Sequence, residues 1–102
     1  MELTVLAVPG CPNAPVLEQR IAEVLAGRPG VSMRRIEITD IAAASRQGMN
    51  GSPTLLVNGL DPFADPGTRA ALACRLYRDE NGHISGAPSV AALREALDQA
   101  VS

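Results

Sequence analysis

The residues most informative about the fold of this chain are Gly48-Met49-Asn50-Gly51-Ser52-Pro53-Thr54-Leu55-Leu56-Val57-Asn58-Gly59. Its apolar run Thr54-Leu55-Leu56-Val57 predicts a short buried strand, and Asn58-Gly59 favours a tight turn after it. Pro53 stands directly before the run, where its missing N–H does no harm at a strand start. The residues alone favour a trans Ser52-Pro53 bond, since few such bonds in folded proteins are cis.

Two strand-helix units are predicted before this stretch. Leu3-Thr4-Val5-Leu6-Ala7-Val8 is almost continuously apolar, as in a strand covered on both faces. Apolar residues at helical spacing then predict a helix that ends near Gly27, and alternation from Ser32 to Ile38 predicts a second strand. Asp40 caps a short Ala-rich helix that ends by Gly48. The apolar face of the first helix consists of Leu17, Ile21, Val24 and Leu25.

A loop, a hairpin and a last helix are predicted after Gly59. Residues 60–73 carry two Asp-Pro pairs and indicate an insertion or an elaborate loop. Cys74-Arg75-Leu76-Tyr77-Arg78 is strand-like, and Asn81-Gly82 offers a turn before His83-Ile84. Ser89 caps the final helix. Its docking face is formed by Val90, Leu93, Leu97 and Val101.

Composition predicts one small domain and excludes several partners. The chain has 102 residues, 46% of them hydrophobic, and a formal net charge of -2, which suits a single domain over residues 1–102. With only two aromatic residues and no long basic run, we expect no nucleic acid as a partner. No apolar run is long enough for a membrane span or a secretory leader, so we expect a cytoplasmic protein that does not bind membranes. We also expect a monomer.

Cys11 is the principal candidate for chemistry. It lies in Val8-Pro9-Gly10-Cys11-Pro12-Asn13-Ala14, between the first strand and the first helix. Loop residues on both sides predict a thiol near the surface, where the helix dipole favours the thiolate. Either Asn13 or Cys11 can be the N-cap of the helix. If Asn13 is the N-cap, Cys11 lies outside the helix and the dipole stabilises its thiolate only slightly. Ala14 stands where a local Cys-x-x-Cys motif would have its second cysteine.

The other polar candidates are less specific. Cys74 shares its alternation parity with Leu76, which predicts a buried side chain, while the functional alternative is a second thiol that meets Cys11. Whether the two cysteines approach each other is left open by the sequence. His83 is expected to face solvent at a turn, and no metal site is predicted. Asp61, Asp65 and Asp79 are carboxylates that could each approach Cys11.

The order β-α-β-α-β-β-α, with a cysteine after the first strand and Ser52-Pro53-Thr54 before the third, resembles the thioredoxin superfamily. The resemblance covers nearly the whole chain. It implies an α/β fold with a central mixed sheet of four to five strands flanked by three helices. It also implies that the Ser52-Pro53 bond is cis and faces Cys11. Carried over, the substrate would contact Pro12, Asn13, Ser52, Pro53 and Thr54.

The function expected first is thiol-disulfide exchange or another thiol-dependent redox role, with Cys11 as a single nucleophile of the monothiol type. Its partners would be protein or small-molecule thiols and disulfides. No resident cofactor is expected, and glutathione is a candidate co-substrate that would resolve the mixed disulfide.

Two alternatives stay open. The motifs around Cys11 and Ser52, together with Asp61-Pro62-Phe63 and Cys74-Arg75-Leu76-Tyr77, resemble small proteins called alkylmercury-lyase-like. That resemblance implies handling of organomercurials or soft metals through Cys11 and Cys74. The third class is a non-catalytic module that binds a protein segment at Ser52-Pro53-Thr54, because one fold supports many functions.

Overall fold

The first half of the chain forms a strand-helix-strand unit in the computed structural model, which describes residues 1–101. β1 (Glu2–Ala7) leads into α1 (Asn13–Leu25), and α1 crosses to β2 (Ser32–Glu37). β1 and β2 are parallel, with Leu3 opposite Met33. The continuous apolar run of β1 fits this place, because every residue from Leu3 to Ala7 is buried.

β4 (Thr54–Val57) completes a three-stranded sheet in the order β2-β1-β4. It runs antiparallel to β1, with Leu55 opposite Val5. The predicted turn follows β4 directly, since Asn58 and Gly59 both have positive φ, at 52° and 85°. The Val57 N–H donates to the Leu60 carbonyl at 2.7 Å across this turn. Two residues with positive φ are what a tight turn of the mirror-image type requires.

Four more short strands form two separate ladders. β3 (Asn50–Ser52) pairs in parallel with β5 (Ala71–Cys74), and β6 (Tyr77–Arg78) pairs antiparallel with β7 (Ile84–Ser85). The prediction of one central sheet of four to five strands is therefore not confirmed, and the described residues form a mixed α/β structure with three helices. Pro53 lies between β3 and β4 and has no N–H to donate to a ladder.

Side-chain caps define the two remaining helices as predicted. Asp40 accepts a hydrogen bond from the Ala43 N–H at 2.7 Å at the start of α2 (Ile41–Gln47). Gly48 ends α2 with a φ of 90°. Ser89 accepts from the Ala92 N–H at 3.1 Å at the start of α3 (Val90–Val101). Both caps satisfy amide groups that a helix start leaves without partners.

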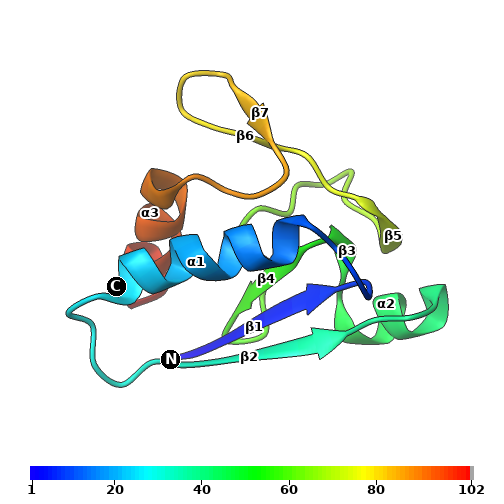
Figure 1. The fold of residues 1–102 in the computed structure, drawn as a ribbon, viewed down its shortest axis with the longest axis horizontal. Helices are drawn as coiled ribbons and strands as arrows, with labels where there is room; N and C mark the ends of the chain where they lie inside the picture. Colours follow the sequence, from blue (N-terminus) through cyan, green and yellow to red (C-terminus); the bar gives the residue numbers. More distant parts are fainter. Residues whose placement is uncertain (102) are drawn as a thin grey trace.

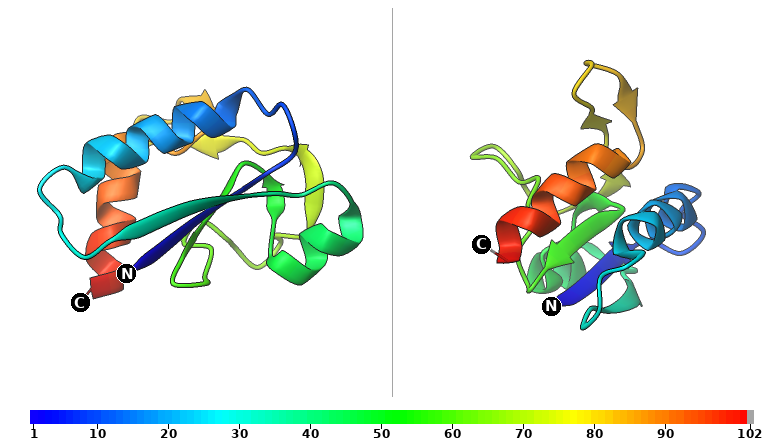
Figure 2. Two further views of the ribbon diagram at one scale, coloured as in Figure 1. Left: turned by 60° about the horizontal axis from the view of Figure 1, so that its bottom comes forward. Right: turned by 90° about the vertical axis from the view of Figure 1, so that its left-hand side faces the viewer.

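The two faces of the three-stranded sheet are covered differently, as Figure 1 and Figure 2 show. α1 and α3 lie on one face and share a core with alternate residues of β1, Leu3 and Val5. Leu6 points to the other face, where Ala44 of α2 and Leu72 of β5 pack near it. The alternation of β1 thus divides the apolar residues between two clusters.

Two details of the prediction are wrong. The strand expected over residues 74–78 is broken, because β5 ends at Cys74 and β6 begins at Tyr77. On α3, Leu93 and Leu97 are buried as predicted, but Val101 is 67% exposed at the end of the helix. The docking face of α3 therefore ends before its last turn. Among residues 1–101, no helix is long and apolar enough to cross a membrane.

Leu97→Ala should lower the free energy of unfolding by about 2–5 kcal/mol, because Leu97 is 1% exposed and its removal leaves a cavity. Val101→Ala is the matched control on the same helix, and we expect a change within about 0.5 kcal/mol. Urea unfolding followed by circular dichroism measures both. Equal losses of stability in the two variants would show that the docking face of α3 extends to Val101.

Candidate functional site

Cys11 lies in the turn between β1 and α1 and is 5% exposed. Its N–H donates to the Val8 carbonyl at 3.2 Å, and its side chain packs with Ala7 and Ala14. The expectation that loop residues hold this thiol at the surface is therefore wrong. Two small alanines let the turn fold against the sheet, so that the thiol is enclosed while Pro12 stays exposed beside it.

The start of α1 differs from both alternatives that the sequence left open. The N-cap is Pro12, without a side-chain cap, so neither Asn13 nor Cys11 holds that position. Pro15 is then the third helical residue, whose amide position has no partner within the helix. Asn13 is half-buried and packs against the backbone of Gly86, so closely that a Cβ at Gly86 would overlap the Asn13 side-chain amide. Cys11 stands one residue before the N-cap.

The Ser52-Pro53 peptide bond is cis, as the sequence resemblance implies. Ser52, Pro53 and Thr54 are all buried. The Ser52 hydroxyl accepts a hydrogen bond from the Val8 N–H at 3.0 Å, which ties this segment to the turn of Cys11. The Ser52 carbonyl accepts from the Arg75 N–H at 3.1 Å. The chain therefore covers with its own residues the segment that was expected to line an open site.

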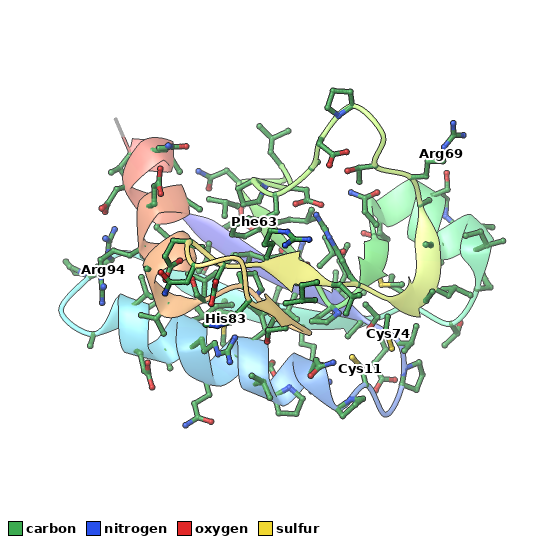
Figure 3. The ribbon with its side chains drawn as sticks, turned by 90° about the horizontal axis from the view of Figure 1, so that it is seen from above. Cys11, Phe63, Arg69, Cys74, His83 and Arg94 are labelled. Carbon is green, nitrogen blue, oxygen red and sulfur yellow. The ribbon has the colours of Figure 1, made fainter. Side chains whose placement is uncertain are left out.

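Cys74 lies beside Ser52 on the neighbouring strand β5. It is the last residue of β5 and the register partner of Ser52 in the parallel ladder, and its side chain is exposed. The prediction of a buried Cys74 is therefore wrong. Figures 1 and 2 place the turn after β1 beside the end of β5, and in Figure 3 the labelled Cys11 and Cys74 side chains lie next to each other. Both cysteines are free thiols.

A buried ion pair holds the segment that follows Cys74. The Arg75 Nη1 donates to Asp61 Oδ2 at 2.6 Å, and the two side chains are only 11% and 6% exposed. Asp61 also accepts from the Asn50 side-chain amide and from the Phe63 N–H, each at 2.9 Å. Arg75 Nη1 further donates to the Thr54 hydroxyl at 3.3 Å. A buried charge pair needs such additional hydrogen bonds to offset the cost of desolvation.

Tyr77 completes this arrangement from β6. Its hydroxyl donates to the Pro53 carbonyl at 2.6 Å, and its ring meets Phe63 edge-to-face with centroids 5.7 Å apart. The Arg75 guanidinium lies 4.8 Å from the ring centroid, which is within the range of a cation-π contact. Burial raises the pKa of the Tyr77 phenol well above its usual value, although the charge of Arg75 opposes the shift.

Residues 74–77 alternate between buried and exposed as the sequence predicts, but the prediction of which residues are buried is wrong. Cys74 and Leu76 were expected to face the core, yet Leu76 is 69% exposed and Tyr77 is buried. Arg75 can point inward because Asp61 neutralises its charge. Tyr77 can point inward because its hydroxyl donates a hydrogen bond to the Pro53 carbonyl. The available signal was the presence of Asp61 in the preceding loop, which offered a partner for an arginine turned inward.

The remaining polar candidates lie apart from the cysteines. Asp65 accepts from the Gly67 N–H at 2.9 Å within its own loop. Asp79 accepts from the His83 N–H at 2.8 Å in the β6–β7 hairpin, and this backbone hydrogen bond lowers the pKa of its carboxyl. The His83 side chain is 81% exposed, in agreement with the prediction that it faces solvent. Within residues 1–101, no three His, Cys, Asp or Glu side chains gather as a metal site would need.

Comparison with known protein families, with curated proteins and with solved structures finds no match to this chain.

Tyr77 provides a pH test of the buried network, because the chain has one tyrosine and no tryptophan. Its pKa is raised in the folded protein, so the stability it contributes is present below the unfolded value near 10 and is lost as the pH rises above it. The loss should approach about 1.4 kcal/mol per pH unit. Urea unfolding between about pH 8 and 11 should show this slope in the wild type and a much weaker one in Tyr77→Phe. Tyrosinate absorbance that rises near pH 10 without unfolding would contradict a buried phenol.

Gly51 tests the close contact between β3 and the segment after β5. Its φ is 104°, and a Cβ there would stand 2.8 Å from the Arg75 Cβ. Gly27→Ala is the control, because Gly27 also has a positive φ but faces open space. We expect a loss of about 1–2 kcal/mol for Gly27→Ala and about 1–3 kcal/mol more for Gly51→Ala, measured by chemical unfolding. Equal losses would show that Arg75 does not pack on Gly51.

Proposed function

We propose that the protein is a thioredoxin-like thiol-disulfide protein in which Cys11 and Cys74 act as one redox pair. The observation that carries the proposal is the meeting of both cysteine segments at Ser52, whose hydroxyl binds Val8 and whose register partner is Cys74. The thioredoxin-like assignment is supported by the β1-α1-β2 unit, by β4 antiparallel to β1, and by the cis bond before Thr54.

Different exposure of the two thiols suggests different roles. Cys74 is exposed, so an external disulfide reaches its sulfur first. Cys11 is 5% exposed and is shielded by Ala7 and Ala14, which protects it from direct attack by a large partner. This division of roles replaces the single nucleophile at Cys11 that the sequence suggested. Cys11 keeps a catalytic part as the thiol that resolves the intermediate.

The proposed reaction is a reduction of a substrate disulfide by the two thiols. The Cys74 thiolate attacks one sulfur, the substrate S–S bond breaks, and the leaving sulfur departs as a thiolate that takes up a proton. The Cys11 thiolate then attacks the Cys74 sulfur and releases the second substrate thiol. The substrate gains two electrons while the protein is oxidised to a Cys11–Cys74 disulfide. Two molecules of an external thiol such as glutathione restore the dithiol form by the same kind of exchange and leave as their own disulfide.

The buried ion pair supplies the position of Cys74. Arg75 follows Cys74 in the chain, its N–H holds the Ser52 carbonyl, and its guanidinium is bound by Asp61. These bonds keep the end of β5 beside the turn of Cys11. Arg75 and Asp61 are therefore positioning residues, whereas the two sulfurs are the reacting atoms.

Binding of a soft metal ion between the same two sulfurs is the second candidate, and the juxtaposition of the cysteines favours it as well. Two thiolates suit a soft cation such as Hg²⁺. Cleavage of a carbon-mercury bond would also need an acid, and the Asp61 carboxylate is already bound by Arg75, Asn50 and Phe63. This candidate is therefore limited to binding.

A non-catalytic module that binds a protein segment at Ser52-Pro53-Thr54 has less support. The Ser52 carbonyl is bound by the Arg75 N–H and the Pro53 carbonyl by the Tyr77 hydroxyl. A docking strand would have to displace both groups.

Reaction of the reduced protein with excess 4,4′-dithiodipyridine tests the redox pair. The wild type should release about two equivalents of thiopyridone and retain no label, because the first mixed disulfide closes onto the second thiol. Cys11→Ser should release about one equivalent and keep one label on Cys74. Cys74→Ser should react much more slowly, because its remaining thiol is buried. Mass spectrometry counts the labels and maps the disulfide.

If both cysteines of the wild type stay labelled, the redox pair is contradicted. The remaining redox proposal would then be a monothiol mechanism, in which one cysteine acts alone. The metal candidate is distinguished by titration with Hg²⁺ in competition with dithiothreitol. Metal binding would be favoured if the wild type retains one Hg²⁺ ion while Cys11→Ser and Cys74→Ser both lose it. The dithiodipyridine experiment would then have to show no disulfide closure.

A further inference from the structure

The outer edge of β5 has no strand partner within residues 1–101, and Cys74 lies at the end of this strand. β3 pairs with the inner edge of β5, and Figure 1 shows β5 on the outer side of this two-stranded ladder. Ala73 and Cys74 are exposed, whereas Leu72 packs against the apolar cluster that includes Ala44 of α2. The proposed redox pair uses the Cys74 sulfur but gives no role to this edge.

The backbone of Cys74 offers hydrogen-bonding groups at this outer edge. The Ala71 N–H and the Arg75 N–H both donate to carbonyls on the β3 side, at 3.1 Å. The C=O and N–H of a trans peptide point opposite ways, so the Cys74 carbonyl points away from β3. The parallel ladder also places the N–H groups of Leu72 and Cys74 on the outer edge. An added strand would therefore find donors and acceptors next to the exposed thiol.

Charged side chains protect the edge at β2 but not the edge at β5. β2 is an edge strand of the three-stranded sheet and presents Arg34, Arg35 and Glu37, which are all exposed. β5 has the sequence Ala71-Leu72-Ala73-Cys74, which contains no charged residue. Charges on an edge strand hinder the addition of a further strand. The edge that carries the thiol is thus the one left open to strand pairing.

The spacing of paired strands suits disulfide exchange at Cys74. Two residues of an antiparallel pair that exchange both backbone hydrogen bonds have Cα atoms about 5.5 Å apart. The Cα atoms of two disulfide-bonded cysteines are usually about 4.4–6.8 Å apart. A cysteine opposite Cys74 in an added antiparallel strand therefore stands at a separation that a disulfide bond permits.

The cis peptide segment beside the thiols does not offer free backbone groups of this kind. The Ser52 carbonyl accepts from the Arg75 N–H at 3.1 Å, and the Pro53 carbonyl accepts from the Tyr77 hydroxyl at 2.6 Å. An extended partner would have to displace both donors there. At β5 it would displace none of these bonds.

We propose that the substrate of Cys74 is an extended protein segment, which adds to the outer edge of β5 as an antiparallel strand with its disulfide cysteine opposite Cys74. The inference rests on the proposed redox function and names its substrate class. The Cys74 thiolate attacks the sulfur of that cysteine, the substrate S–S bond breaks, and the leaving sulfur takes up a proton. Backbone hydrogen bonds to Leu72 and Cys74 hold the mixed disulfide until Cys11 resolves it.

A short peptide rich in Thr and Val, with one central cysteine activated as its mixed disulfide with thionitrobenzoate, tests the edge. Attack by Cys74 on the peptide sulfur releases coloured thionitrobenzoate, which gives the rate. The full-length Cys11→Ser variant is used, so that Cys74 is the one thiol present. The mixed disulfide of glutathione with thionitrobenzoate is the small substrate. Each rate is divided by the rate of the same reagent with dithiothreitol, which corrects for intrinsic reactivity.

We expect the peptide to react about tenfold faster than the glutathione reagent, because backbone hydrogen bonds to two residues of β5 stabilise its transition state. In the resulting mixed disulfide, amide hydrogen exchange followed by NMR should slow at Leu72 and Cys74.

N-methylation of the peptide tests the strand pairing without a further change to the protein. Methyl groups on the nitrogens of the cysteine and of the residue two positions later remove the donors that face Cys74 and Leu72. This peptide should lose the tenfold advantage. The matched control carries its two methyl groups one and three positions after the cysteine, on nitrogens that point away from β5. It should react at nearly the rate of the unmethylated peptide.

Equal corrected rates for the peptides and the glutathione reagent would overturn the added strand and leave small disulfides as the substrate class. An equal loss of rate in the two methylated peptides would also overturn it. Absence of any reaction at Cys74 would instead contradict the proposed function itself. Closure of the Cys11–Cys74 disulfide is measured separately in the wild type, so a failure of the redox pair is seen there and not in these rates.

Discussion

The buried pair of Arg75 and Asp61 is the interaction on which the site depends. Two charged groups that leave water lose several kcal/mol of hydration each, and their attraction repays this only when hydrogen bonds satisfy the remaining donors and acceptors. Both Asp61 oxygens are used, by Arg75, Asn50 and the Phe63 N–H. The pair joins the loop after β4 to the segment after β5, together with the contact between the Phe63 and Tyr77 rings.

Several features of the structure depend on that pair through direct contacts. The inward direction of Arg75 places its Cβ against Gly51, and only a residue without a Cβ fits there. Arg75 points inward, whereas Cys74 before it and Leu76 after it are exposed. The charge pair thus holds the residue next to the thiol that we assign to the first step of the reaction.

Local patterns in the sequence predicted most of the elements, whereas the site depends on contacts between distant residues. The helix caps at Asp40 and Ser89 and the turn at Asn58-Gly59 were predicted correctly, since each is formed within a few residues. The exposure of Cys11 and of Cys74 was predicted wrongly in both cases. The enclosure of Cys11 depends on Ala7 and Ala14, and the direction of Cys74 depends on Asp61. Alternation in the sequence shows which residues of a strand share a face but not which face is buried. Here the pairing of Arg75 with Asp61 places Arg75 on the buried face.

The two cysteines, whose segments meet at Ser52, are far apart along the chain, at positions 11 and 74. A bond between them would close a loop of some sixty residues in the unfolded protein, which in the loop-entropy account stabilises the fold by about 4 kcal/mol. Because oxidation and folding are then linked, the same free energy lowers the reduction potential of the pair, by about 90 mV for two electrons. Thermal stability and electron affinity of this small domain would change together, and a cell that alters its thiol balance would alter the lifetime of the fold.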